Sequence, residues 1–278
     1  MTATVPLVFL TACSPLKVLS VLSPSRHYAP ELDLHYGSDE RQRLDVYLPS
    51  PVPETAPLVV FFYGGSWTNG DKADYEFVAA SLTEAGIVVV IPNYRLYPAV
   101  RFPAFVEDGA DAVAWSLANI SSYGVDPSSV YVMGHSAGAH IAAMLAMNGD
   151  YLASHDIETD ALGGFIGLSG PYDFLPIEGG FLEEVFPPTS RSASQPINFV
   201  SRAAPPTLLI HGTGDTTVSI ANSRGLAAAL RERAVDVTLK TYEGVGHIRV
   251  MLGLAKPIDF LASTLEDSRA FILDTSTQ

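Results

Sequence analysis

The sequence of 278 residues contains a single cysteine, Cys13, and few basic residues. One cysteine excludes an intrachain disulfide and leaves no thiol pair for redox chemistry. Lysine and arginine together number 16 against 30 aspartates and glutamates, which gives a formal net charge of −14. A chain of this charge is not expected to bind nucleic acid or to dock electrostatically on anionic lipid. The acidic surface is therefore interpreted as a solvated one.

Long apolar runs are also missing, because no stretch approaches the roughly 20 residues of a membrane-spanning helix. The short apolar segment 5–12 leads into L-T-A-C at 10–13, which resembles the bacterial lipoprotein box, where the chain is cut before a cysteine that is then lipidated. The segment is shorter than in that pattern, and neither lysine nor arginine precedes it. The alternative is an irregular terminus. Residues 1–30 are expected to form a lipoprotein signal and tether, which places the protein in the cell envelope if Cys13 is lipidated and in the cytoplasm otherwise.

Hydrophobic residues make up 47% of the chain, which is ample for a sizeable core. An antiparallel strand pair is predicted at 32–36 and 44–48, and continuous apolar runs then alternate with helical patterns. The apolar runs predict strands at 58–63, 87–92, 130–134, 165–168, 207–211 and 237–242. The helical patterns lie near 73–85, 103–120, 137–147, 219–233 and 256–272. Because such runs are typical of strands buried on both faces, residues 31–278 are expected to form one α/β domain, with a mainly parallel central sheet and helices on both faces.

The pentapeptide G-H-S-A-G at 134–138 is the most informative motif in the sequence. An apolar run precedes it and a helical pattern follows, so Ser136 is predicted at the apex of a strand–turn–helix. Such a turn strains the backbone of the serine and needs small residues two positions to either side. The strain exposes the hydroxyl, and the helix that follows directs its amino terminus at a reacting carbonyl. Ser136 is therefore the candidate nucleophile.

A serine hydroxyl is a poor nucleophile unless a base lies within hydrogen-bond reach. The candidate base is His247, in G-V-G-H at 244–247 after the last predicted strand. Two glycines in a loop after a strand suit a side chain that must reach across the edge of the sheet. Of the other histidines, His135 is expected to point away from Ser136, and His211 is expected to pack beneath the loop of the acid.

The candidate acid is Asp215, in T-G-D-T-T-V at 213–218, just past the end of the preceding predicted strand. A carboxylate there can accept the N–H of the imidazole. The chain order serine, aspartate, histidine is that of the α/β-hydrolase fold and differs from the orders of trypsin and subtilisin. Asp173 also follows a predicted strand and is the rival acid.

Attack on a carbonyl creates a negative oxygen that needs preorganised donors. One candidate donor is the backbone N–H of Ala137, the residue after the nucleophile. The others are Gly65 and Ser66, with Gly64 as an alternative, in Y-G-G-S-W at 63–67 after the strand predicted at 58–63. This chemistry requires neither a metal nor a cofactor.

Three motifs together resemble the hormone-sensitive-lipase and carboxylesterase branch of the α/β-hydrolases. Y-G-G-S-W at 63–67 is similar to that branch's H-G-G-x-W, with Tyr63 in place of the histidine. N-Y-R-L-Y-P at 93–98, followed by F-P-A and Asp108, is similar to its Y-R-L-x-P…F-P-A…D segment. The turn around Ser136 resembles that of small bacterial esterases, including feruloyl/acetyl-xylan esterase-like and kynurenine formamidase-like members. The resemblance implies an α/β-hydrolase catalytic domain without a large cap, and a structural role for Arg95 and Asp108.

The segment 172–201 interrupts the alternation of strands and helices with prolines and phenylalanines. Because open α/β sheets bind ligands beyond the carboxyl ends of their strands, this excursion is expected to form a wall of the acyl or leaving-group pocket. The candidate pocket residues are Trp67, Tyr172 and Phe174. The alternatives are a surface loop packed on the domain and, for Trp67, packing beneath its own loop.

The sequence thus predicts a serine carboxylesterase that hydrolyses short-chain or small aromatic esters through an acyl-enzyme on Ser136. An amidase or formamidase, a thioesterase and a prolyl-oligopeptidase-like peptidase remain as alternatives, because they share the catalytic groups. A non-catalytic lipoprotein that binds a partner through a hydrolase fold is the alternative from another class.

Overall fold

The computed structural model describes residues 28–275, so Cys13 and the predicted signal lie outside the described residues. The predicted tether extends to residue 30, but the first strand, β1 (Tyr28–His35), already begins at Tyr28. This strand pairs with β2 (Arg43–Pro49) in antiparallel register, so residues 28–30 belong to the sheet. Among the described helices, none is both long enough and apolar enough to cross a bilayer.

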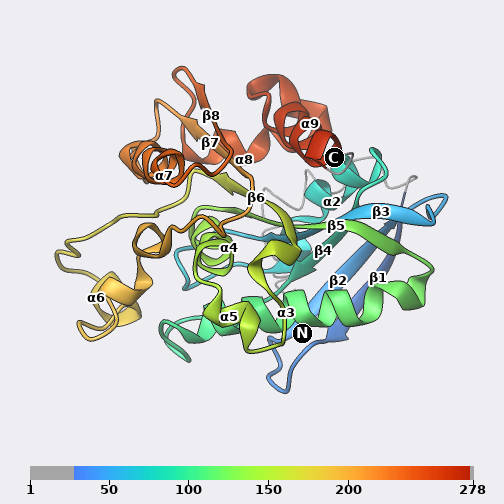
Figure 1. The fold of residues 1–278 in the computed structure, drawn as a ribbon, viewed down its shortest axis with the longest axis horizontal. Helices are drawn as coiled ribbons and strands as arrows, with labels where there is room; N and C mark the ends of the chain where they lie inside the picture. Colours follow the sequence, from blue (N-terminus) through green and yellow to red (C-terminus); the bar gives the residue numbers. More distant parts are fainter. Residues whose placement is uncertain (1–27, 276–278) are drawn as a thin grey trace, which may run out of the picture.

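A single sheet with the order β1-β2-β4-β3-β5-β6-β7-β8 forms the centre of the described chain (Figure 1). Strands β1, β2 and β4 pair antiparallel, and every pairing from β4 through β3 to β8 is parallel. The remaining strand bounds are β3 (Thr55–Phe62), β4 (Val88–Pro92), β5 (Asp126–His135), β6 (Leu162–Leu168), β7 (Thr207–Gly212) and β8 (Val237–Tyr242). The mainly parallel α/β architecture is confirmed.

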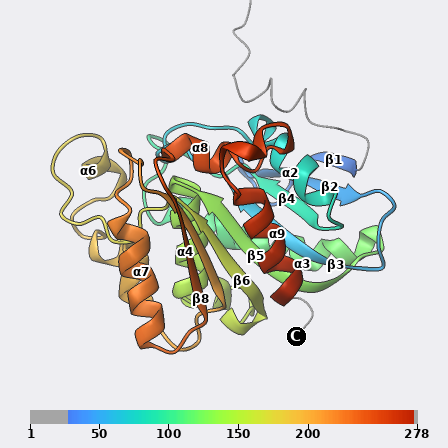
Figure 2. The same ribbon diagram turned by 90° about the horizontal axis from the view of Figure 1, so that it is seen from above.

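Helices cover both faces of the sheet (Figure 2). One face carries α2 (Glu76–Thr83) and α9 (Thr264–Thr275), and the other carries α3 (Ala104–Asn119), α4 (Ala137–Met147) and α7 (Ala221–Glu232). Shorter helices are α5 (Asp150–Ala153), α6 (Leu182–Val185) and α8 (His247–Leu252). The central strands β3 and β4 are buried almost throughout because helices pack on both sides of them.

Two predictions are wrong near the carboxyl end of the chain. The helix expected over 256–272 is divided into a 3₁₀ segment, Lys256–Leu261, and α9. The chain crosses itself there, since a Cβ at Gly253 would lie 2.6 Å from the carbonyl oxygen of Ala262. Strand β8 is the edge of the sheet and exposes half of its residues, so its apolar pattern does not reflect burial on both faces.

The excursion 172–201 contains α6 and two 3₁₀ turns, and it projects beyond the end of β6 at one side of the molecule (Figure 1). Phe186 is fully buried against the body of the domain, whereas Phe181 is 45% exposed. The segment therefore combines both interpretations, because one of its phenylalanines packs on the domain while another stays accessible.

Candidate active site

The turn at Ser136 has the strained geometry that the motif predicts. Strand β5 ends at His135, α4 begins at Ala137, and Ser136 between them has a φ of 55°. Such left-handed conformations of a non-glycine residue cost about 1–3 kcal/mol. A Cβ at Gly134 would lie 2.3 Å from the carbonyl oxygen of Gly138, and one at Gly138 would lie 2.1 Å from that of Phe62. The turn therefore cannot accept larger residues at either glycine.

Asp215 and His247 come together from the loops after β7 and β8. His247 is the first residue of α8, and its Nδ1 lies 2.7 Å from Asp215 Oδ2. The other carboxylate oxygen accepts the backbone N–H groups of Thr217 and Val218, each at 2.9 Å. Burial raises the pKa of Asp215, but hydrogen bonds from His211, His247 and Val218 outweigh it and hold the pKa well below its usual range. The carboxylate is therefore ionised and oriented toward the imidazole.

A second imidazole lies against Asp215, and sequence reasoning assigned it only a packing role. His211 is fully buried beneath the loop of the acid, and its Nε2 lies 3.2 Å from Asp215 Oδ2 and 3.0 Å from the carbonyl oxygen of Val218. Because both neighbours are acceptors, Nε2 carries the proton. Its Nδ1 lies 2.7 Å from the hydroxyl of Ser223, which fixes the ring from the other side.

His135 does not point away from the site, so that prediction is wrong. Its ring centroid lies 4.6 Å from that of His247, and its Nε2 lies 3.2 Å from the carbonyl oxygen of His247. Burial lowers the pKa of His135 to about 3, so the ring is neutral and supports His247 as a packing partner and donor. No spacing signal marks this role, because it depends on the return of the chain 112 residues later.

Ser136 and His247 face one cavity of about 510 Å³, here called the histidine cavity; its other lining residues include Gly65, Ser66, Asn69, Tyr75, Ile248 and Met251. Among the described residues, the hydroxyl of Ser136 has no hydrogen-bond partner. The hydroxyl therefore lines the cavity without an acceptor or donor from the described part of the chain. Hydrogen bonds of catalytic groups often tighten only when substrate is bound.

The loop after β3 presents backbone donors next to this hydroxyl. Gly65, Ser66 and Trp67 have φ values of 135°, 53° and 59°. The carbonyl of Gly65 turns inward and accepts the N–H groups of residues 68 and 69 at 3.0 and 3.1 Å. Within the described chain, the N–H groups of Gly65, Ser66 and Ala137 have no partner. A Cβ at Gly64 would lie 3.1 Å from the Cβ of Ser136, so the loop directly abuts the turn. The three candidate oxyanion donors are thus free and adjacent.

A second cavity, of about 380 Å³, shares Ser66, Ser136 and Thr217 with the first. We call it the aromatic cavity, and its lining also includes Trp67, Ala137, Phe174, Phe181, Leu182 and Val218. Trp67 both lines it and packs, since the indole is 5% exposed and its ring centroid lies 4.8 Å from that of Phe186. The prediction that Tyr172 lines the pocket is wrong, because its side chain is fully buried against Phe165 and lines neither cavity. The wall formed by 172–201 therefore comes from Phe174, Phe181 and Leu182.

Other candidate residues lie apart from the two cavities. Asp173, the rival acid, is exposed, and its backbone N–H donates to Asn222. Within the described residues, its carboxylate bonds to no histidine. Arg95 and the fully buried Asp108 form an ion pair at 2.6 Å, consistent with the structural role that the resemblance implies. Across the part of the chain that the structure describes, no cluster of three histidine, cysteine or acidic side chains is arranged to hold a metal ion.

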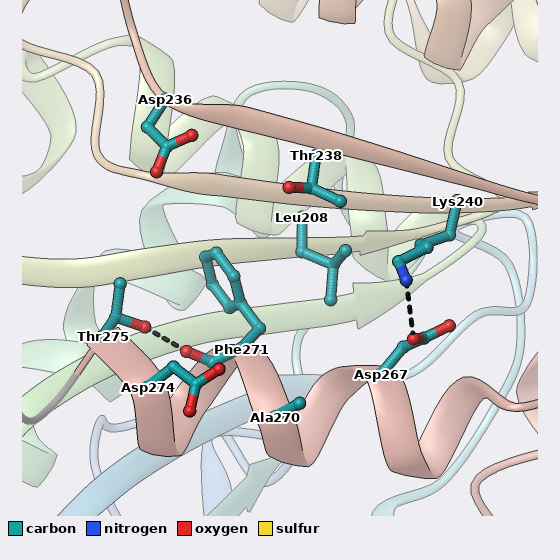
Figure 3. Close-up of a pocket in the computed structure, with 9 residues that line it drawn as sticks. All are labelled: Leu208, Asp236, Thr238, Lys240, Asp267, Ala270, Phe271, Asp274 and Thr275. Carbon is teal, nitrogen blue, oxygen red and sulfur yellow. Dashed lines mark hydrogen bonds and ion pairs between the residues drawn. The ribbon is translucent and has the colours of Figure 1, made fainter.

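A third cavity, of about 310 Å³, lies between β8 and α9 (Figure 3). Lys240 and Asp267 form an ion pair across it at 3.1 Å, and the Thr275 hydroxyl donates to the Phe271 carbonyl within α9. The cavity contains none of the residues singled out from the sequence and no serine–histidine pair. It is therefore not a candidate for this chemistry.

The sheet order, the strained serine turn and the chain order of serine, acid and histidine define an α/β-hydrolase. Solved structures share this fold. A truncated carbohydrate esterase from gut microbiota superposes with a TM-score of 0.78 at 23% identity, covering 91% of this chain and 98% of that one. Thermogutta terrifontis esterase 2 superposes with a TM-score of 0.75 at 24% identity, covering 90% and 95%.

The chain belongs to the BD-FAE family, which matches residues 44–230. It is 32% identical over 242 residues to the isoprenylcysteine alpha-carbonyl methylesterase ICME of Arabidopsis thaliana, covering 78% of this chain and 56% of that protein. It is 33% identical over 230 residues to the esterase LipC of Mycobacterium tuberculosis, covering 74% and 56%. The chain thus spans little more than half the length of these curated relatives.

Proposed function

We propose that this chain is a serine carboxylesterase that hydrolyses small esters through an acyl-enzyme on Ser136. The observation that carries the proposal is the 2.7 Å hydrogen bond between Asp215 and His247, whose imidazole shares a cavity with Ser136. The similarity to a plant methylesterase and to a mycobacterial esterase agrees with this proposal.

In the proposed reaction the Ser136 hydroxyl attacks the ester carbonyl while His247 Nε2 takes its proton. The ionised Asp215 stabilises the imidazolium that forms, and the N–H groups of Gly65, Ser66 and Ala137 bind the oxyanion. His247 then donates the proton to the leaving alcohol. A water molecule, activated by the same imidazole, attacks the acyl-enzyme and releases the carboxylic acid and free Ser136.

The two cavities support separate sites for the two halves of the ester. His247 lines only the histidine cavity, so the alcohol that receives its proton belongs there. The acyl group then belongs in the aromatic cavity, which Ala137 lines. A cavity of about 380 Å³ walled by Trp67, Phe174 and Phe181 fits a short-chain or small aromatic acyl group.

The test is hydrolysis of p-nitrophenyl acetate by the wild-type chain and by Ser136→Ala. We expect the variant to remain folded by circular dichroism and to lose turnover, and a fluorophosphonate to label the wild type alone. Equal turnover by both proteins contradicts the proposal. Absence of labelling of the folded wild type favours the non-catalytic binding protein instead.

A panel of matched esters, amides and thioesters with one acyl group separates the remaining alternatives. The carboxylesterase proposal expects kcat/KM to be highest for the oxygen ester of a small acid. A higher value for the amide favours an amidase, a formamidase or, with peptide substrates, a prolyl-oligopeptidase-like peptidase. A higher value for the thioester favours a thioesterase.

We also propose a lipid anchor at Cys13, which would place the enzyme in the cell envelope. The support is the L-T-A-C sequence at 10–13. Incorporation of a palmitate analogue by the full chain in a bacterial host, and its loss in Cys13→Ser, is the expected result. A chain that takes up no label belongs to the cytoplasmic alternative.

A further inference from the structure

The oxyanion loop, residues 64–70, is held by a side chain from the far end of the sheet. Arg41 lies in the turn between β1 and β2. Its Nε donates to the carbonyl oxygen of Tyr94 at 2.9 Å. Its Nη2 donates to the Tyr63 hydroxyl at 2.8 Å and to the Gly70 carbonyl oxygen at 3.0 Å. We propose that Arg41 is a positioning residue for the oxyanion hole, an inference that rests on the proposed esterase function.

The loop needs such support because its own conformation is unfavourable. Gly65, Ser66 and Trp67 follow one another with positive φ, and two of them carry side chains. Residues in this region keep that conformation only where the surrounding structure fixes it. The same conformation turns the Gly65 carbonyl inward and leaves the Gly65 and Ser66 N–H groups free. Whatever fixes the ends of the loop therefore also fixes the direction of the oxyanion donors.

Arg41 contacts the loop at both of its ends. Tyr63 immediately precedes it, and its ring is stacked between those of Tyr75 and Tyr94 at centroid distances of 5.2 and 4.8 Å. At the other end, a Cβ on Gly70 would lie 2.5 Å from Cε2 of Tyr63, so the chain returns directly onto that ring. One guanidinium thus joins the residues at which the loop leaves and rejoins the body of the domain.

Tyr63 occupies the position of the histidine in the H-G-G-x-W motif, and its hydroxyl explains how the loop is anchored here. The hydroxyl accepts from Arg41 and donates to Asn93 Oδ1 at 2.7 Å. Asn93 Oδ1 also accepts the backbone N–H of Lys72 at 2.8 Å. The phenol therefore points toward Arg41 and Asn93, and the anchor consists of Tyr63 with these two partners. A lysine cannot reproduce it, because an ammonium lacks the planar fork that spans three acceptors.

The test compares Arg41→Met with Arg43→Met, a matched control two residues along, whose guanidinium contacts the carbonyl oxygen of Asp33 at 3.4 Å. With p-nitrophenyl acetate we expect Arg41→Met to lower kcat by about 10- to 100-fold and to change KM less than about threefold, because oxyanion donors act mainly on the transition state. We expect Arg43→Met to stay within about twofold of wild type in both constants, because the side chain of Arg43 makes one long hydrogen bond within residues 28–275, to Asp33, and none to the oxyanion loop. Tyr63→Phe, which removes only the hydroxyl, should give a smaller loss of kcat.

Amide hydrogen exchange gives a readout that does not depend on turnover. In Arg41→Met, exchange should accelerate in the peptide spanning 64–70 and stay unchanged in peptides from α7 and β8. If the wild type hydrolyses no ester, the proposed function fails, whereas exchange in 64–70 still decides whether Arg41 holds the loop. The inference is overturned if kcat in Arg41→Met stays within twofold of wild type, if Arg43→Met loses as much, or if exchange accelerates throughout the molecule.

Discussion

Asp215 keeps its charge in a buried place because donors surround both of its oxygens. His247 and His211 approach Oδ2, and the N–H groups of Thr217 and Val218 bond to Oδ1. An unpaired buried carboxylate would take up a proton, whereas this one is stabilised as an anion. The imidazole of His247 is thereby fixed in one tautomer, with its Nε2 left to accept the proton of Ser136 in the proposed reaction.

Replacing Asp215 by asparagine should remove most of the activity and little of the fold. An amide has nearly the same shape, but it no longer stabilises an imidazolium and does not select the tautomer of His247. We expect kcat on p-nitrophenyl acetate to fall by about 10³- to 10⁴-fold, the size of effect seen for such substitutions in serine hydrolases.

Asp173→Asn is the matched control, because this exposed residue is the rival acid. Its kcat should remain within about twofold of wild type, as expected for a surface substitution. A large loss in Asp173→Asn together with an active Asp215→Asn would reverse the assignment of the acid.

At the scale of single elements, the excursion 172–201 supplies a wall of the aromatic cavity, the proposed site of the acyl group. Phe181 lines the aromatic cavity and is 45% exposed, so its ring contributes little to the core. Ile248, on α8, lines the histidine cavity and is 53% exposed. These two residues therefore allow the two proposed sites, for the acyl group and for the alcohol, to be tested independently.

Phe181→Ala should widen the aromatic cavity and shift preference toward longer acyl groups. We expect the ratio of kcat/KM for p-nitrophenyl octanoate over acetate to rise by about 3- to 30-fold, within the range that one or two apolar contacts supply. Ile248→Ala should leave this acyl ratio unchanged and alter the preference among alcohols of one acetate series. The opposite pattern would exchange the two cavity assignments.

The sequence predicts local elements well where one short stretch contains the whole signal. The glycines around Ser136 and the apolar runs of β3 and β4 are of this kind, because steric limits and burial act on neighbouring residues. The roles of His135, His211 and Arg41 depend on contacts that the sheet creates between distant loops, so no spacing reveals them. The pocket role predicted for Tyr172 is wrong for the same reason, because an aromatic residue after a strand can point into the core or into a cavity.

At the scale of the whole molecule, the parallel sheet brings the loops after β3, β5, β7 and β8 together at the carboxyl ends of its strands. Each contributes a different part of the proposed site: oxyanion donors, nucleophile, acid and base. The domain also buries the imidazoles of His135 and His140. Burial lowers the pKa of His140 from its ordinary value of 6.5 to about 4, and that of His135 to about 3.

These histidines should make folding stability depend on pH. A folded pKa below the unfolded one means that the unfolded chain binds more protons, so stability falls as the pH drops from 6.5 toward 4. We expect the free energy of unfolding, measured with urea, to fall with pH in the wild type. In His140→Phe its slope against pH should be smaller, by up to about 1.4 kcal/mol per pH unit. Equal slopes in the two proteins would mean that His140 is protonated equally in the folded and unfolded chains.

Ser136 lines both cavities, and this has a consequence for the acyl-enzyme. With its acyl group in the aromatic cavity, the acyl-enzyme would leave the histidine cavity open to water and to alcohols once the first alcohol has departed. An added alcohol would then act as an acyl acceptor, and transesterification would compete with hydrolysis whenever alcohol is abundant.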